Sequence, residues 1–263
     1  MNDALPAAPS TPAASGDGYG DDYLTWKNWQ ASDFGQVSRY QRHYFPREMA
    51  RCQRPLPAGS RVLELGFGNG AFMAWGRAQG WHMHGTEVNP PLVEAARAAG
   101  FEAVCADSLE PWPDAWFDLV VAFDVLEHIP QAALPGVLRS IQRVLKPGGA
   151  FLARFPNADS PFGLANQHGD LTHVTAIGRG KVVYLANRLG AELTYVGAEA
   201  EPLWVGLSLT SVQHILSAPL KALAAWAVRL VFLPHAKTAF FSPNLVMVLR
   251  WNPAAGGQGP GGR

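Results

Sequence analysis

The stretch Val62-Leu63-Glu64-Leu65-Gly66-Phe67-Gly68-Asn69-Gly70 decides the fold that this sequence predicts. An apolar strand, interrupted by one carboxylate, runs into glycines at every second position. Glycine lets the backbone turn sharply, and because it has no Cβ a ligand can lie against the main chain. A strand, a glycine-rich turn and a helix in this order are typical of a nucleotide-type cofactor site.

The spacing of the glycines and the position of the carboxylate favour one kind of cofactor. The turn reads Gly-x-Gly-x-Gly, whereas the dinucleotide fingerprint is Gly-x-Gly-x-x-Gly. Glu64 would repel a pyrophosphate, but it suits a molecule that carries an ammonium and a sulfonium group. The motif therefore favours S-adenosylmethionine (SAM), and it disfavours an NAD-dependent dehydrogenase, which is the alternative at the level of the fold.

Short apolar runs alternate with helical stretches on both sides of this motif. Such alternation predicts parallel strand–helix–strand units. The expected strands are 61–65, 82–87, 102–105, 117–123, 149–155, 191–198 and 244–250, and the expected helices are 70–79, 90–99, 132–145 and 178–189.

The organisation along the chain follows from composition. At 263 residues, of which 48% are hydrophobic, one domain with additions is expected. We expect a disordered leader at 1–22, an aromatic-rich helical cap at 23–58, the main domain at 59–251 with a helical insertion at about 202–242, and a disordered tail at 252–263.

Charge and cysteine content restrict the function classes. The 21 basic and 21 acidic residues balance, so nothing supports a general nucleic-acid binder. Cys52 and Cys105 are far apart and show no redox or metal-ligand spacing, and we expect no metal. The leader has no basic residue and no apolar run, which does not fit a signal peptide, so the sequence predicts a cytoplasmic protein.

Acidic residues end the next two predicted strands. Glu87 lies 21 residues after Gly66, where a carboxylate can accept hydrogen bonds from ribose hydroxyls. Asp107 is placed to accept from an adenine amino group, and its alternative role is to cap a helix. Asp124, Glu127 and His128 follow the fourth strand, at the edge of the sheet where ligands bind.

These residues together resemble the class I SAM-dependent methyltransferases. The matching segments are Glu64-x-Gly66-x-Gly68-x-Gly70, Glu87, Asp107, Asp124-Val-Leu-Glu-His128 and Leu145-Lys-Pro-Gly-Gly149. The resemblance implies a Rossmann-like, doubly wound α/β sheet of seven strands with the last strand antiparallel. It also implies that SAM binds here and leaves as S-adenosylhomocysteine. The implied cofactor-binding residues are Glu64, Gly66, Phe67, Gly68, Gly70, Glu87, Val88, Asp107, Ser108, Asp124 and Val125.

A narrower resemblance covers most of the chain and concerns the acceptor of the methyl group. The chain looks like bacterial methyltransferases associated with surface-polysaccharide and glycan synthesis in five segments: Trp26-Lys27-x-Trp29, Leu65-Gly-Phe-Gly-Asn-Gly70 with Trp75, Phe155-Pro-Asn157-Ala-Asp-Ser-Pro-Phe162, Gly169-Asp-Leu-Thr-His173 and Ser242-Pro-Asn244. This resemblance implies a sugar hydroxyl as acceptor. A quinone, a lipid or another small metabolite is the alternative acceptor, and a non-catalytic SAM-binding module is the alternative of another class.

The Asp-Leu-Thr-His element and the fourth strand supply the candidate catalytic residues. His173, paired with Asp170, is a candidate general base, because a neutral imidazole can take a proton near neutral pH. His128 is the competing base. Both His173 and Asp170 can instead fix the loop by hydrogen bonding.

The insertion contains an apolar helical segment at 214–233. Leu216, Leu220, Leu223, Ala227 and Leu230 recur at helical spacing. Three roles stay open: a lid packed on the core, a homodimer interface, or a contact with the inner face of a membrane. No stretch approaches the roughly 18 uninterrupted apolar residues that a membrane span needs.

Overall fold

The sheet at the centre of the computed structural model has seven strands in the order β3-β2-β1-β4-β5-β7-β6. The structure describes residues 33–233 and 239–251. Strands β1 to β5 pair in parallel, and β7 runs antiparallel to both β5 and β6. The predicted seven-stranded sheet with an antiparallel last strand is therefore confirmed. The strands are β1 Arg61–Leu65, β2 His82–Glu87, β3 Glu102–Cys105, β4 Phe117–Phe123, β5 Leu145–Pro156, β6 Glu192–Ala198 and β7 Asn244–Arg250.

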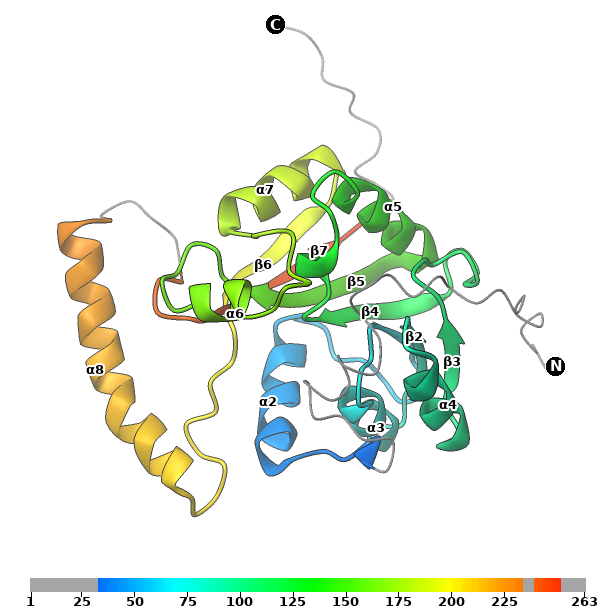
Figure 1. Ribbon diagram of the computed structural model, residues 1–263, viewed down its shortest axis with the longest axis horizontal. Coiled ribbons are helices and arrows are strands. Elements are labelled where there is room, and N and C mark those ends of the chain that lie inside the picture. The colour runs from blue at the N-terminus through cyan, green and yellow to red at the C-terminus, as the bar shows by residue number, and fades with distance from the viewer. Residues whose placement is uncertain (1–32, 234–238, 252–263) are drawn as a thin grey trace, which may run out of the picture.

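Helices cover both faces of this sheet, as Figure 1 shows, with α5 and α7 on one face and α2, α3 and α4 on the other. The helices are α2 Arg39–Ala50, α3 Ala71–Ala78, α4 Pro90–Ala98, α5 Leu134–Val144, α6 Leu164–His168, α7 Arg179–Arg188 and α8 Leu209–Val231, and a short 3₁₀ turn, η2, spans Leu126–His128.

Alternation along the strands explains why the sheet has two apolar layers. On β4, Leu119 and Val121 belong to the core shared with α2, α3 and α4, whereas Val120 and Ala122 belong to the core shared with α5 and α7. All four side chains are at most 1% exposed. A strand buried on both faces reads as a continuous apolar run, which is the pattern that the sequence shows at 117–123.

The strand order places the site. The chain runs from β1 outward to β3 and then returns to the other side of β1 with β4. In doubly wound sheets a crevice opens at this reversal, outside the carboxyl ends of the strands. The turns that follow β1, β2 and β4 therefore meet at one edge of the sheet.

Two segments differ from the sequence prediction. Strand β5 begins at Leu145 and not at 149, because the Lys-Pro-Gly-Gly segment continues along β4 past a register shift. The described part of the aromatic cap forms one helix, α2, which starts at a capping box built by Ser38 and Gln41. The leader, the tail and the first part of the cap, with Trp26 and Trp29, lie outside the described residues, so the domain boundaries there stay predictions.

The insertion before the last strand is helical, as predicted, but it does not pack on the core. Figure 1 shows α8 beside the molecule and not over a face of the sheet. Leu216, Leu223 and Trp226 are 66%, 61% and 62% exposed, so of the three roles left open the lid packed on the core does not fit these side chains. By length and composition, Ser211–Val231 could cross a membrane, with a mean hydropathy of 1.2.

Candidate cofactor and acceptor site

The glycine turn after β1 needs glycine for its backbone conformation. Gly66, Gly68 and Gly70 have φ angles of 60°, 52° and 70°, in the left-handed region that L side chains rarely adopt. A Cβ on Gly66 would also lie 2.8 Å from Cγ2 of Val125, in the turn after β4. The turn therefore brings bare backbone to the edge of the sheet and leaves room there for a ligand.

Glu87 at the end of β2 fixes the position of this turn. Its carboxylate accepts hydrogen bonds from the backbone N–H of Gly68 at 3.0 Å, of Val88 at 2.8 Å and of Asn89 at 3.1 Å. Burial raises the pKa of Glu87, and these backbone donors oppose that shift. A carboxylate has about four acceptor positions, so one remains for a ligand hydroxyl.

Glu64 interacts electrostatically with Glu87 and is also buried. Glu64 is only 4% exposed. Burial raises the pKa of Glu64 well above its usual range, and the negative charge of Glu87 adds to this shift, whereas a hydrogen bond from the backbone of Met73 opposes it. The Oε2 atom of Glu64 is buried and has no hydrogen-bond partner among the described residues. Because an unpaired buried acceptor is costly, this atom marks a position for a donor or a cation from a ligand.

A cavity of about 1500 Å³ joins these groups. Ligand pockets typically measure ~300–1000 Å³, so the cavity has room for a cofactor and an acceptor. All the predicted cofactor-binding residues line it except Gly70, which starts α3 and leaves space for the ring of Phe34. The ring of Phe67 packs in the core against Gly85. The roles of these residues toward the ribose and adenine stay predictions.

An ion pair between Arg154 and Asp124 lies at the wall of the cavity, and both side chains are partly exposed. Arg154 of β5 donates from Nε to Oδ1 of Asp124 at 3.0 Å and from Nη2 to Oδ2 of the same carboxylate. It also donates from Nη1 to the hydroxyl of Tyr44 on α2 at 3.1 Å. Asp124 has a φ angle of 57°, and Arg154 holds it in this strained conformation. The pair fixes the turn after β4 against the helical cap.

A set of hydrogen bonds joins two further segments that are more than forty residues apart in sequence. The carbonyl oxygen of Glu127 accepts from the backbone N–H of Val174 and of Thr175, both at 2.9 Å. The hydroxyl of Thr175 donates to the carbonyl oxygen of Ile129 at 2.6 Å. The loop 170–175 is thereby fastened to the turn after β4, and the two candidate bases, which the sequence places apart, become neighbours.

His128 is oriented by a chain of two hydrogen bonds. The hydroxyl of Thr172 lies 2.5 Å from Oδ1 of Asp170 and 2.9 Å from Nδ1 of His128. An ionised carboxylate only accepts, so Thr172 gives its one proton to Asp170 and accepts from Nδ1–H of His128. This tautomer leaves the lone pair of a neutral His128 on Nε2, and His128 lines the large cavity.

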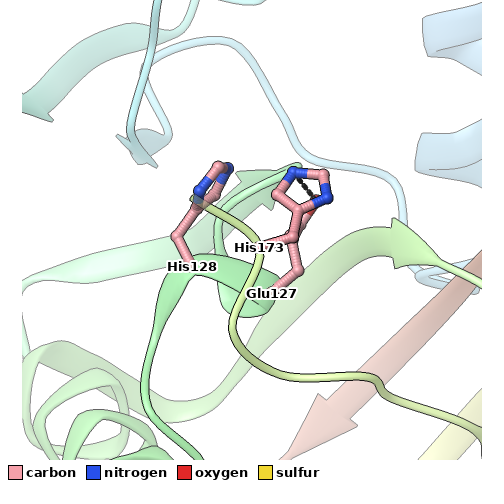
Figure 2. A group of neighbouring side chains, drawn as sticks. All are labelled: Glu127, His128 and His173. Carbon is pink, nitrogen blue, oxygen red and sulfur yellow. Dashed lines mark ion pairs between the residues drawn. The ribbon is translucent and has the colours of Figure 1, made fainter. Parts of the chain in front are cut away.

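The ring of His173 lies beside that of His128 (Figure 2), with ring centroids 4.5 Å apart, but its nitrogens have other partners. Its Nδ1 lies 2.9 Å from the carbonyl oxygen of Asn166, while Nε2 lies 3.5 Å from Oδ2 of Asp170 and 3.9 Å from Oε1 of Glu127. The side chain is 7% exposed. Neither His173 nor Asp170 is among the described residues that line the large cavity. This placement fits a role in holding the loop better than contact with an acceptor.

Glu127, His128 and His173 are also close enough to hold a metal ion. Their rings and carboxylate meet at the end of β4, and the ligand atoms lie within 4.8 Å of one another (Figure 2). Imidazole and carboxylate groups are ordinary ligands of Zn²⁺ and related ions. The sequence predicted no metal, and that expectation stays a prediction.

The sequence alone did not predict a role for two residues of this site, Thr172 and Arg154. Thr172 stands inside the Asp-Leu-Thr-His element, but its hydroxyl gains a role only when the loop reaches His128. Arg154 did leave a signal, because it is the one charge in the apolar run 150–155 of a predicted strand. Such a charge is seldom buried without a partner.

Comparison with known proteins gives a family match over most of the chain. A family model described as a methyltransferase domain matches residues 37–225. The 27-O-demethylrifamycin SV methyltransferase of Amycolatopsis mediterranei is 32% identical over 193 residues, which cover 62% of this chain and 69% of that protein.

Other relatives match a shorter part. A ubiquinone biosynthesis O-methyltransferase of Xanthomonas oryzae is 31% identical over 117 residues, covering 41% of this chain, and the chain spans about half of that relative's length, 48%. Among solved structures, a SAM-dependent methyltransferase from Archaeoglobus fulgidus superposes with a TM-score of 0.58 at 18% identity, over 81% of this chain and 95% of that one. At this identity the structural match concerns the fold.

Proposed function

Because this chain belongs to the methyltransferase-domain family and is a SAM-dependent methyltransferase, we propose that it transfers the methyl group to a hydroxyl, with a sugar or glycan intermediate as the acceptor. The observation that carries the proposal is the chain from Asp170 through Thr172 to His128 at the wall of the large cavity. A hydroxyl needs help to lose its proton, and an oriented imidazole supplies that help.

The cofactor side needs three contributions from the protein. The unpaired Oε2 of Glu64 would accept from the ammonium group of the cofactor, the remaining lone pair of Glu87 would accept from a ribose hydroxyl, and the glycine turn would leave space for the methionine part. Bound SAM supplies a methyl group on a sulfonium, which is already activated for transfer. The task left to the protein is alignment, which contributes roughly 7–11 kcal/mol in favourable cases.

Polar side chains on the acceptor side support a sugar. Ser38 and Gln41 of the helical cap, Arg154 and His128 all line the cavity. Sugars offer many hydroxyls, and polar groups at fixed positions recognise them. The link to bacterial surface-polysaccharide synthesis, like the cytoplasmic location, remains part of the proposal.

A quinone or another small aromatic metabolite is the second candidate acceptor. Tyr40, Tyr44 and Phe123 line the same side of the cavity and offer flat apolar surfaces. The names of two relatives, a 27-O-demethylrifamycin SV methyltransferase and a ubiquinone biosynthesis O-methyltransferase, support an acceptor other than a sugar.

Labelled SAM with panels of acceptors tests the proposal. We expect SAM to bind in calorimetry and methyl transfer to nucleotide sugars or glycan intermediates with a free hydroxyl. Transfer to phenols and quinols alone would favour the second candidate. SAM binding without any product, across both panels, would favour a non-catalytic SAM-binding module and overturn the proposal.

A further inference from the structure

Helix α8 is amphipathic, but its apolar face points away from the body of the protein, whereas a helix that packs on a core turns its apolar face inward. Its charged and small side chains face the body of the protein: His214, Lys221 and Arg229, with Ala222 and Ala225, line a cavity of about 580 Å³ between the helix and the body. Lys221 pairs with Glu201 at 2.5 Å, and Nδ1 of His214 lies 2.8 Å from the carbonyl oxygen of Pro202. The polar face is thus the inner face.

The outer face of α8 carries the large apolar side chains. They recur at spacings of three and four residues, which is the period of one helix face. Their exposed fractions range from 47% for Ile215 to 89% for Leu209. This outer stripe consists of Leu209, Val212, Ile215, Leu216, Leu220, Leu223, Trp226 and Leu230. Exposed apolar surface of this extent marks an interaction site.

From this inverted amphipathicity we propose that the outer stripe of α8 docks on an anionic lipid bilayer surface. The helix contains Lys221 and Arg229 and no acidic residue; Lys221 is paired with Glu201, so the apolar stripe supplies most of the attraction and the basic polar face adds to it at anionic headgroups. Leu and Trp on one side and basic residues on the other are typical of helices that lie in the plane of a membrane interface. The body then sits on the aqueous side, where the polar face of α8 already points.

The topology of the sheet argues that α8 lies on the bilayer and does not cross it. Strand β6 precedes the helix, β7 follows it, and the two strands are hydrogen-bonded neighbours. A crossing helix would put these strands on opposite sides of the membrane. A return through the lipid would expose irregular backbone to hydrocarbon, which does not occur.

A second copy of this chain is the competing occupant of the stripe. A stable interface buries about 800 Å² on each partner and uses about 20–30 residues a side. The outer stripe is the face of a single helix that stands beside the body (Figure 1), which offers a narrow and convex surface for that purpose. Two copies would also bring only basic side chains from α8, with no charge complementarity between them.

Docking of the stripe would bring the bilayer close to the acceptor side of the large cavity. Tyr40 lines both this cavity and the one behind α8. The proposal is independent of which acceptor is methylated, because it concerns the surface of α8 and not the chemistry at His128.

Flotation of the full chain with vesicles tests the proposal. Vesicles of phosphatidylcholine and phosphatidylglycerol are mixed with the natural protein, with the triple variant Leu216→Gln, Leu223→Gln and Trp226→Gln, and with Tyr184→Gln as a matched control. Tyr184 is 61% exposed on α7, which packs on β6. We expect the natural protein and the control to float and the triple variant to bind at least about tenfold more weakly, since each buried large apolar side chain contributes about that factor.

Two measurements keep the outcome clear. Calorimetry with SAM on each variant shows that the fold and cofactor site are intact, so a failure of flotation is separate from a failure of the proposed function. Light scattering without lipid gives the oligomeric state. Absence of flotation by the natural protein, or equal flotation by the triple variant, would overturn the proposal, as would a dimer that dissociates in the triple variant and does not float.

Discussion

The two halves of the cavity are built in different ways. On the cofactor side, the contacts come from one continuous segment, and Glu87 reaches Gly68 only nineteen positions away. On the acceptor side, Thr172 reaches His128 across 44 positions, and Arg154 reaches Tyr44 across 110. The difference shows that local sequence builds a cofactor site that can be recognised from a motif, whereas the acceptor site depends on how distant loops meet.

The largest effect is expected on the acceptor side. His128→Gln should lower kcat by about 10²–10⁴-fold, the usual contribution of general-base catalysis, while the affinity for SAM stays within about twofold. Product formation from labelled SAM and calorimetry measure the two quantities. Thr172→Val should act in the same direction with a smaller effect, because it removes the group that orients His128.

His173→Gln is the matched control for that experiment. Since Nε2 of His173 faces Asp170 and Glu127, we expect this variant to be clearly less stable while its kcat falls only slightly. A loss of kcat at His173 that exceeds the loss at His128, in a folded protein, would assign the base to His173.

On the cofactor side, Glu87→Ala should weaken SAM binding by on the order of 10²–10³-fold. The change leaves the N–H groups of Gly68, Val88 and Asn89 without their acceptor, and each unpaired buried group costs about 1–3 kcal/mol. Calorimetry measures the loss, and Glu94→Ala on the exposed side of α4 is the control. Unchanged affinity in Glu87→Ala would show that this carboxylate does not support the turn.

The buried carboxyl groups of Glu64 and Glu87 should make the stability of the free protein depend on pH. Their pKa values are raised in the folded protein, so this contribution to stability is present below the unfolded pKa of about 4.3 and is lost as the pH rises through the folded pKa. A cationic cofactor compensates the ionised carboxylates. The increase in Tm on adding SAM should therefore be larger near pH ~8 than near pH ~5.

Glu64→Gln sharpens that prediction. The variant should bind SAM roughly tenfold to a hundredfold more weakly, because it loses one charge-assisted hydrogen bond, and the Tm of the free protein should depend less on pH. Thermal unfolding across pH, with and without SAM, measures both. An affinity equal to that of the natural protein would remove Glu64 from the cofactor site.

The smallest effect is expected from metal removal. A sulfonium is an activated donor, so treatment with a chelator should leave kcat within about twofold. The assay uses labelled SAM with and without EDTA. A loss of activity that added Zn²⁺ or Mg²⁺ restores would instead indicate that Glu127, His128 and His173 hold an ion, in line with their spacing.

Much of the fold was predictable because its signals are local. The apolar runs, the glycines that end them and the helix periods gave the strands and the order in which they alternate, and the antiparallel last strand followed from the family resemblance. The sequence could not predict which face of a helix is buried and which is exposed to solvent. The spacing of Leu216, Leu223 and Trp226 is the same for a packed helix and for one that turns its apolar face outward.

By itself the sequence determined the donor side of this protein, since a glycine that must adopt a left-handed φ and a carboxylate at a strand end carry their roles wherever the strand lies. The tertiary structure alone decided the acceptor side. It places Nε2 of His173 near Asp170, orients His128 through Thr172 and Asp170, and pairs Arg154 with Asp124. The physical reason is that hydrogen bonds and ion pairs between distant segments depend on distances and angles that no periodicity in the chain encodes.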